Sequence, residues 1–147
     1  MSNPTAPHSE RVIGTPDGSA KPLPSAARRK VVLVVDDDPG ARDALLQLLS
    51  DRYDVVTAMD GVDGFEMATL LDPDLIVTDV TMPRLDGVAM VKRIRARMQR
   101  KAPVIFLTGC DTPSDVIAGI SAGARHYLSK PVDINDLERR IEHAIGV

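Results

Sequence analysis

Three short runs of aliphatic residues constrain the fold of this chain more than any other feature of its sequence. They are VVLVV at 31–35, LIV at 75–77 and VIFL at 104–107, and none of them alternates with polar residues. Strands of this composition are buried on both faces, as in a parallel sheet covered by helices. YDVVTA at 53–58 is a weaker, mixed run that suits an edge strand, and HYLS at 126–129 is a fifth candidate.

Stretches with helical periodicity separate these runs. Apolar residues recur at helical spacing in 39–51, 61–71, 86–98, 113–122 and 133–145. The apolar face predicted for the first helix consists of Ala41, Leu45, Leu48 and Leu49. Alternating strands and helices predict a doubly wound α/β fold, (βα)5, with a five-stranded parallel sheet of order 2-1-3-4-5, as in flavodoxin-like proteins. The length favours this open sheet over a closed eight-stranded barrel, which needs roughly 250 residues.

Polar side chains follow four of the five predicted strands. Asp36, Asp37 and Asp38 follow the first strand, Asp79 the third, Thr108 the fourth and Lys130 the fifth. In the order 2-1-3-4-5, these four strands lie side by side, so the polar groups gather at the rim where ligands bind in such sheets. Each residue also has a purely structural explanation, and Asp38 before Pro39 fits a helix N-cap equally well. Their common position at the strand ends favours a shared site.

This set of side chains suits phosphoryl transfer. Clustered carboxylates form a hard oxygen site for Mg²⁺, which cancels their mutual repulsion. Asp36 and Asp37 form a pair suited to metal binding, and Asp79, alone on a central strand, is the predicted nucleophile that forms an acyl phosphate. The groups expected to contact the phosphoryl oxygens are the Lys130 ammonium, the Thr108 hydroxyl and the backbone N–H of Gly109.

Composition narrows the class of protein. A hydrophobic content of 44% with 27% charged residues is normal for a soluble globular protein. The net charge of -3 argues against a general nucleic-acid or acidic-membrane binder, because no global positive field attracts phosphates. The single cysteine, Cys110, excludes an internal disulfide, and we see neither a membrane-length apolar run nor a signal peptide. We therefore expect a cytoplasmic protein.

Residues 1–29 differ from the rest of the chain. They contain five prolines and almost no aliphatic periodicity, so they are predicted to form a disordered leader. Residues 30–147 are predicted to form one domain. The sequence stops directly after the fifth helical stretch, so we expect no effector domain.

Four motifs, in chain order, resemble the receiver domain of two-component response regulators of the single-domain type. VVLVVDDDP resembles the first strand of that family with its acidic pair, and LIVTDVTMPRLDG resembles its phosphoacceptor segment. FLTG and YLSKP resemble the segments that carry its switch threonine and its Lys-Pro pair. The resemblance extends over residues 30–147.

The resemblance implies roles for individual residues. Asp79 would accept a phosphoryl group from a histidine kinase or a phosphotransfer protein. Asp37 would bind Mg²⁺ or Mn²⁺ directly and Asp36 largely through water, and Asp79 and the backbone carbonyl of Thr81 would join the coordination sphere. The chain would be a phosphoacceptor that assists its own phosphorylation and dephosphorylation, and not an enzyme.

The resemblance also implies a conformational switch. Thr108 would move toward the phosphoryl group and Tyr127 would rotate inward, which changes the surface formed by the fourth helix, fifth strand and fifth helix. The Lys130–Pro131 bond is often cis in this family. The implied partners are the kinase and an unidentified downstream protein, without nucleic acid or membrane insertion. The chain would be a monomer or a phosphorylation-dependent dimer.

Other functions remain open at this point. A phosphatase of the haloacid dehalogenase type would use Asp36 and Asp38 as its D-x-D motif, but Gly40 is atypical there and Asp79 is left unexplained. A phosphorylation-independent adaptor of the same fold would leave the site unused. A dinucleotide or nucleoside triphosphate binder would lack its essential motif, because neither G-x-G-x-x-G nor G-x-x-x-x-G-K-[ST] occurs. The output could be docking to a target or onward phosphotransfer.

Overall fold

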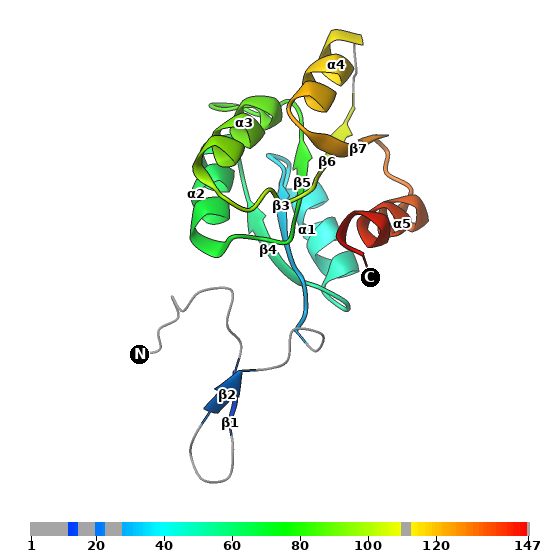
Figure 1. Cartoon of the computed structure of the whole chain (residues 1–147). Coiled ribbons are helices and arrows are strands. Elements are labelled where there is room, and N and C mark those ends of the chain that lie inside the picture. The colour runs from blue at the N-terminus through cyan, green and yellow to red at the C-terminus, as the bar shows by residue number, and fades with distance from the viewer. Residues whose placement is uncertain (1–11, 15–19, 23–27, 110–112, 147) are drawn as a thin grey trace.

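The structure of the chain is a computed structural model that describes residues 12–14, 20–22, 28–109 and 113–146. Its centre is a five-stranded parallel sheet of order β4-β3-β5-β6-β7 (Figure 1). The strands are β3 (Val31–Val35), β4 (Asp54–Ala58), β5 (Leu75–Asp79), β6 (Val104–Thr108) and β7 (Ala124–Ser129). Numbered from β3, this order is 2-1-3-4-5, which confirms the predicted topology and the edge position of the weak second strand.

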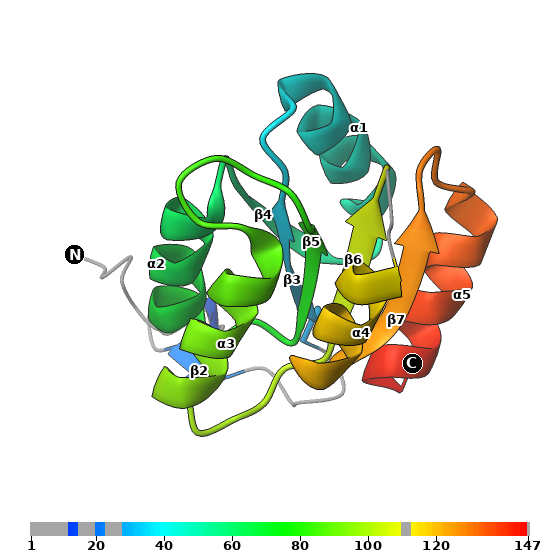
Figure 2. The same ribbon diagram turned by 90° about the horizontal axis from the view of Figure 1, so that it is seen from above.

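Five helices cover the two faces of the sheet. They are α1 (Pro39–Leu49), α2 (Gly61–Leu71), α3 (Gly87–Arg97), α4 (Pro113–Ser121) and α5 (Ile134–Ile145). Figure 2 shows α2, α3 and α4 on one face and α1 and α5 on the other. No helix in the described ranges has the length and apolar character that a membrane crossing requires.

Alternate residues of the central strands fill two separate cores. In β3, Leu33 and Val35 join the core that contains Met90 and Phe106, on the side of α2 and α3. Val32 and Val34 join the core on the side of α1 and α5, which includes Leu45, Leu49, Leu137 and Ile141. All four β3 residues are at most 1% exposed. The unbroken aliphatic run therefore predicted the two-sided burial correctly, because every position of such a strand needs an apolar side chain.

The element boundaries differ slightly from the predicted ones. The first helix ends at Leu49, two residues early, and β7 begins at Ala124, two residues earlier than predicted. Leu48, which was predicted on the buried face of the first helix, is 42% exposed. That prediction was wrong because Leu48 lies about 100° around the helix from Leu49 and points away from the sheet.

Part of the predicted leader is described. The strands β1 (Val12–Gly14) and β2 (Ala20–Pro22) pair antiparallel. Residues 1–11, 15–19 and 23–27 lie outside the described ranges, so the expectation of disorder stays a prediction. Arg29 donates a hydrogen bond to the Tyr53 carbonyl at 3.2 Å and another to the Ser50 carbonyl. These contacts attach the last residue of the predicted leader to the domain.

Candidate functional site

The predicted site residues meet at the carboxyl edge of the sheet. Asp79 and Thr108 are the last residues of β5 and β6, and Asp36 directly follows β3. Lys130 directly follows β7 and donates its backbone N–H to the Thr108 carbonyl at 2.7 Å. Because all five strands are parallel, their arrowheads point to the same edge in Figure 2. The predicted convergence is therefore present in the fold.

Three carboxylates form a compact cluster at this edge. One oxygen from each of Asp36, Asp37 and Asp79 lies within 4.8 Å of the others. Asp36 is 1% exposed, Asp79 is partly buried, and Asp37 is exposed to solvent. The cluster therefore extends from the sheet to the surface, where a phosphoryl donor can approach.

Among the described residues, Lys130 is the one cation that pairs with the carboxylates of this cluster, while the Arg42 guanidinium donates to the backbone carbonyl of Asp36 at 2.9 Å. Its Nζ lies 3.1 Å from Asp36 Oδ2 and 3.1 Å from Asp79 Oδ2. Burial lowers the pKa of the Lys130 ammonium, but its hydrogen bonds to the two carboxylates outweigh this and raise the pKa above its usual value. The side chain therefore carries its positive charge into the site.

Lys130 compensates the negative charge of Asp79 only in part. Burial raises the pKa of the Asp79 carboxyl, the neighbouring Asp36 charge raises it further, and the Lys130 ammonium lowers it only in part. One ammonium shared between two carboxylates cannot satisfy both of them. A further positive charge near Asp79 would therefore stabilise its ionised carboxylate.

The charge balance of the cluster fits a divalent cation. Three carboxylates and one ammonium leave two negative charges without compensation. Mg²⁺ prefers carboxylate oxygens and is bound in proteins through one or two of them together with waters and phosphate oxygens. Asp36, Asp37 and Asp79 present such oxygens at the open edge of the sheet. The residues present thus fit the predicted magnesium site.

Asp38 has a different function from its two neighbours. Its side chain caps α1 by accepting the Gly40 N–H at 3.2 Å, and its own N–H donates to Asp36 Oδ1 at 2.9 Å. The N-cap explanation is therefore correct for this residue. A D-x-D motif of the dehalogenase type needs Asp38 in the site, so the geometry removes that alternative.

The predicted switch residues lie on neighbouring strands. Thr108 is 3% exposed, at the end of β6. The centroids of the Tyr127 ring on β7 and the Phe106 ring are 5.8 Å apart. The Tyr127 ring also packs against Gly119 of α4, where an added Cβ would lie 2.6 Å from it. Gly109 is exposed, and a Cβ there would meet no atom of the described residues within 4 Å. This open space is compatible with a bound phosphoryl group.

Sequence reasoning missed one ion pair beside the site. Asp60, which follows β4, accepts hydrogen bonds from Arg84 at 2.6 and 2.9 Å and from the Asp63 N–H at 2.8 Å. The Asp63 N–H and the Arg84 guanidinium hold the pKa of the Asp60 carboxyl below its usual range. Arg84 adopts a left-handed backbone, with φ of 68°. The pair ties the loop after Asp79 to the start of α2, and no short-range sequence signal predicted it.

Two further predictions have different outcomes. The Lys130–Pro131 peptide bond is cis, as the resemblance implied. Thr81 is exposed in the loop after β5, and the role of its carbonyl in metal binding stays a prediction.

Comparisons with known proteins agree with this geometry. Residues 32–142 match the family model of the response regulator receiver domain. The DNA-binding dual master transcriptional regulator RpaA of Synechocystis sp. is 39% identical over 113 residues, which cover 75% of this chain and 46% of that protein. Response regulator MprA of Mycobacterium leprae is 41% identical over 111 residues, which cover 75% of this chain and 48% of MprA. The chain thus spans about half the length of these curated relatives.

Solved structures share the fold over nearly their whole length. The Vibrio cholerae chemotaxis protein CheY4 matches with a TM-score of 0.75 at 32% identity, covering 80% of this chain and 99% of that structure. A CheY-like receiver domain from Methanospirillum hungatei matches with a TM-score of 0.77 at 25% identity, covering 81% of this chain and 95% of that structure. Together with the acidic cluster and its lysine, these matches establish that the chain belongs to the response regulator receiver domain family of two-component signalling.

Proposed function

We propose that this receiver domain is a phosphorylation switch in which Asp79 is the phosphoacceptor. The observation that carries the proposal is the position of Asp79 beside Asp36, Asp37 and Lys130 at the open carboxyl edge of the sheet. Its donor would be the phosphohistidine of a histidine kinase or of a phosphotransfer protein. The chain acts in this proposal as a regulator that assists its own phosphorylation, and not as a turnover enzyme.

The chemistry assigns a step to each side chain. A carboxylate oxygen of Asp79 forms a bond to phosphorus while the P–N bond to the donor imidazole breaks, and the imidazole keeps the bonding electron pair and takes up a proton. Lys130 would compensate the negative charge on a phosphoryl oxygen, and Thr108 and the Gly109 N–H would donate hydrogen bonds to the phosphoryl group. A Mg²⁺ or Mn²⁺ held by Asp36, Asp37, Asp79 and the Thr81 carbonyl would supply further charge compensation.

The proposed output is the surface of α4, β7 and α5. The acyl phosphate adds a charge of about -1.5 to -2 beside Thr108. A shift of Thr108 would free space for Tyr127, whose ring now lies close to Phe106 and to Gly119 of α4. This rearrangement would change how the surface binds a downstream protein, controls dimerisation or engages an onward phosphotransfer histidine. We place the protein in the cytoplasm and treat residues 30–147 as its receiver domain.

Mass spectrometry of the intact protein tests the assignment. The chain is incubated with acetyl phosphate and Mg²⁺, and wild type is compared with Asp79→Asn and Asp38→Asn. Asn caps helices about as well as Asp, so Asp38→Asn is a matched control that preserves α1. We expect one phosphoryl adduct on wild type and Asp38→Asn, none on Asp79→Asn, and none in EDTA.

The opposite outcomes are equally informative. An adduct on Asp79→Asn would move the acceptor to another residue. No adduct on wild type with any donor would favour the phosphorylation-independent adaptor instead.

A further inference from the structure

The second half of α3 and the loop after it form a strongly basic segment. Six of the eighteen cationic residues of the chain lie between Lys92 and Lys101, and no acidic residue occurs between Asp86 and Asp111. The chain as a whole has a net charge of -3, so this concentration is local. Such a patch attracts anionic groups even when the rest of the surface does not.

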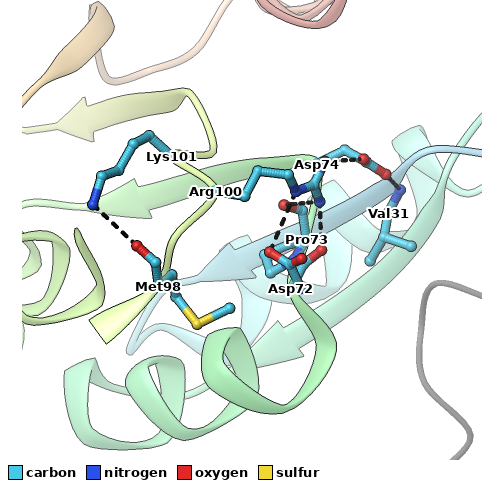
Figure 3. Close-up of polar contacts among 7 residues, drawn as sticks. All are labelled: Val31, Asp72, Pro73, Asp74, Met98, Arg100 and Lys101. Carbon is cyan, nitrogen blue, oxygen red and sulfur yellow. Dashed lines mark hydrogen bonds and ion pairs between the residues drawn. The ribbon is translucent and has the colours of Figure 1, made fainter. Parts of the chain in front are cut away.

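Three of these cations have structural partners. Arg95 donates to the Ala102 and Gly123 carbonyls at 3.0 and 3.1 Å. Arg100 donates to the Asp72 and Pro73 carbonyls and pairs with Asp74 at 2.9 Å, and Lys101 donates to the Met98 carbonyl at 3.0 Å (Figure 3). These side chains fasten the α3–β6 loop to its surroundings.

The other three cations have no such role. Lys92, Arg93 and Arg97 are exposed, and their side chains make no hydrogen bond or ion pair with any residue in the described ranges. Arg93 and Arg97 lie one turn apart, about 6 Å along the helix, where like charges destabilise it. The helix dipole favours a cation in the last turn and so accounts for Arg97, but not for Lys92 or Arg93 in the middle of α3.

An open hollow lies between the two arginines and the neighbouring helix. Its volume is about 300 Å³, and it is lined by Phe65, Arg93, Ala96 and Arg97. Phe65 comes from α2, which lies alongside α3 on the same face of the sheet (Figure 1 and Figure 2). The hollow therefore has an apolar floor and two guanidinium groups at its margin, and neither group forms an ion pair with a residue that the structure describes.

We infer that this α2–α3 face is a docking site for an acidic protein segment that inserts an apolar side chain between Arg93 and Arg97. Carboxylates of the segment would pair with the two guanidinium groups, which present a planar fork suited to carboxylates. Its apolar side chain would fill the hollow over Phe65 and Ala96. The face is separate from the α4–β7–α5 surface, so it would act whether or not Asp79 is phosphorylated.

The observations favour an acidic protein segment over a nucleic acid. A phosphate backbone offers no apolar side chain for the hollow, and the described face has a single aromatic ring for base stacking, Phe65. The remainder of the chain is rich in carboxylates, which repel a long polyanion, whereas a short acidic segment contacts only the basic face.

NMR titration of the full isotope-labelled chain tests this inference. The probe is a glutamate-rich helical peptide of about 20 residues with one central leucine. We expect saturable binding that weakens with added salt, with the largest shift changes at Phe65, Arg93, Ala96 and Arg97. Replacing the leucine with alanine should weaken binding, because the hollow is then unfilled. Asp79→Asn should bind equally well, which separates this inference from the proposed phosphoacceptor.

Charge reversal supplies the decisive comparison. Arg93→Glu/Arg97→Glu should weaken binding at least tenfold, whereas Arg125→Glu/Arg139→Glu, with the same change of net charge on exposed residues elsewhere, should not. If the first variant unfolds, Arg93→Gln/Arg97→Gln replaces it. Absence of saturable binding, or equal weakening by both double variants, would overturn the inference. Tighter binding of a duplex DNA probe through the same residues would make the face a nucleic-acid surface instead.

Discussion

At the scale of single residues, the charge balance of the site depends on Lys130. Its ammonium is the contact that Asp36 Oδ2 and Asp79 Oδ2 share, at 3.1 Å from each. Asp36 is almost fully buried and cannot recover hydration if this cation is removed. The lysine thus stabilises the cluster in addition to its proposed role toward the phosphoryl group.

Lys130→Met should therefore lower the free energy of unfolding in EDTA by about 1–3 kcal/mol, because it leaves a buried carboxylate without its cation. Mg²⁺ should stabilise the variant more than wild type, since a divalent cation then supplies the missing positive charge. Urea unfolding with EDTA and with Mg²⁺ measures both effects. Equal stability of variant and wild type in EDTA would contradict this assignment.

His126 in strand β7 contacts two residues of helix α5. Its Nδ1 lies 3.2 Å from Arg140 and its Nε2 lies 3.3 Å from His143 Nδ1. The two histidines are separated by seventeen positions in the sequence, so no local pattern indicates that they are in contact. A hydrogen bond from the Arg140 cation makes His126 Nδ1 an acceptor, which favours the neutral ring and argues against a metal at this pair.

The protein should lose stability on mild acidification because of His126. Burial lowers the pKa of this ring, and the charges of Arg140, His143 and Arg125 lower it further, against an opposing effect of Asp136. Below about pH 6.5 the unfolded chain then takes up a proton that the native ring does not, so the free energy of unfolding falls. His126→Asn and Arg140→Gln should each show a smaller fall between about pH 7.5 and 5.5 in urea titrations. A fall as large as in wild type would show that other groups cause it.

At the scale of elements, close contacts between loops and helices position the acceptor strand. Asp86 caps α3 by accepting the Ala89 N–H at 2.8 Å, and Gly87 donates its N–H to the Val80 carbonyl at 2.7 Å. A Cβ at Gly87 would lie 2.1 Å from the Asp79 carbonyl oxygen. The Asp-Gly pair thus lets α3 begin directly against the end of β5.

Gly87→Ala should destabilise the fold by about 1–3 kcal/mol, because the methyl group must displace the backbone of Asp79. It should also slow phosphorylation by acetyl phosphate if Asp79 is the acceptor. Gly109→Ala is the matched stability control, since a Cβ there meets no described atom within 4 Å. We expect its effect on the free energy of unfolding to stay within about 0.5 kcal/mol. An equal loss of unfolding free energy in both variants would contradict the proposed clash between a Cβ at position 87 and the Asp79 carbonyl.

Arg100 joins three elements at the opposite edge of the sheet. Its guanidinium donates to carbonyls at the end of α2 and pairs with Asp74, whose other oxygen accepts the Val31 N–H at 2.7 Å (Figure 3). Arg100→Ala should lower the free energy of unfolding, measured in urea, by about 1 kcal/mol. The loss is small because the side chain is half exposed. Arg93→Ala removes an arginine side chain that has no described partner, so it should lower the free energy of unfolding much less. A reversed order would assign the structural role to Arg93.

At the scale of the whole molecule, the contacts of Arg29 with the Ser50 and Tyr53 carbonyls lead to a prediction about where the independently stable unit begins. A chain that starts at Arg28 should match full length in free energy of unfolding within about 0.5 kcal/mol. A chain that starts at Lys30 lacks the hydrogen bonds from Arg29 to the Ser50 and Tyr53 carbonyls and should lose about 1 kcal/mol. Urea unfolding of the three chains measures this, and a large loss on removal of 1–27 alone would show that the leader packs on the domain.

The sequence by itself determined the order of the elements, the parallel sheet and the residues at its carboxyl edge. These features are local: an aliphatic run needs burial on both faces, and Asp79 or Thr108 ends a strand wherever that strand lies. The receiver-domain resemblance rested on the same local segments, and the family comparison confirms it.

Only the tertiary structure decided which polar groups are partners. Asp38 caps a helix while Asp36 contacts Lys130, 94 residues away, and Asp60 contacts Arg84, 24 residues away. Arg100 and Arg93 are both cations of one basic run, so the sequence does not distinguish them. In the structure Arg100 pairs with Asp74, whereas Arg93 has no described partner. Loop paths and helix packing set these distances, and both follow from burial across the whole chain and not from the residues near each position.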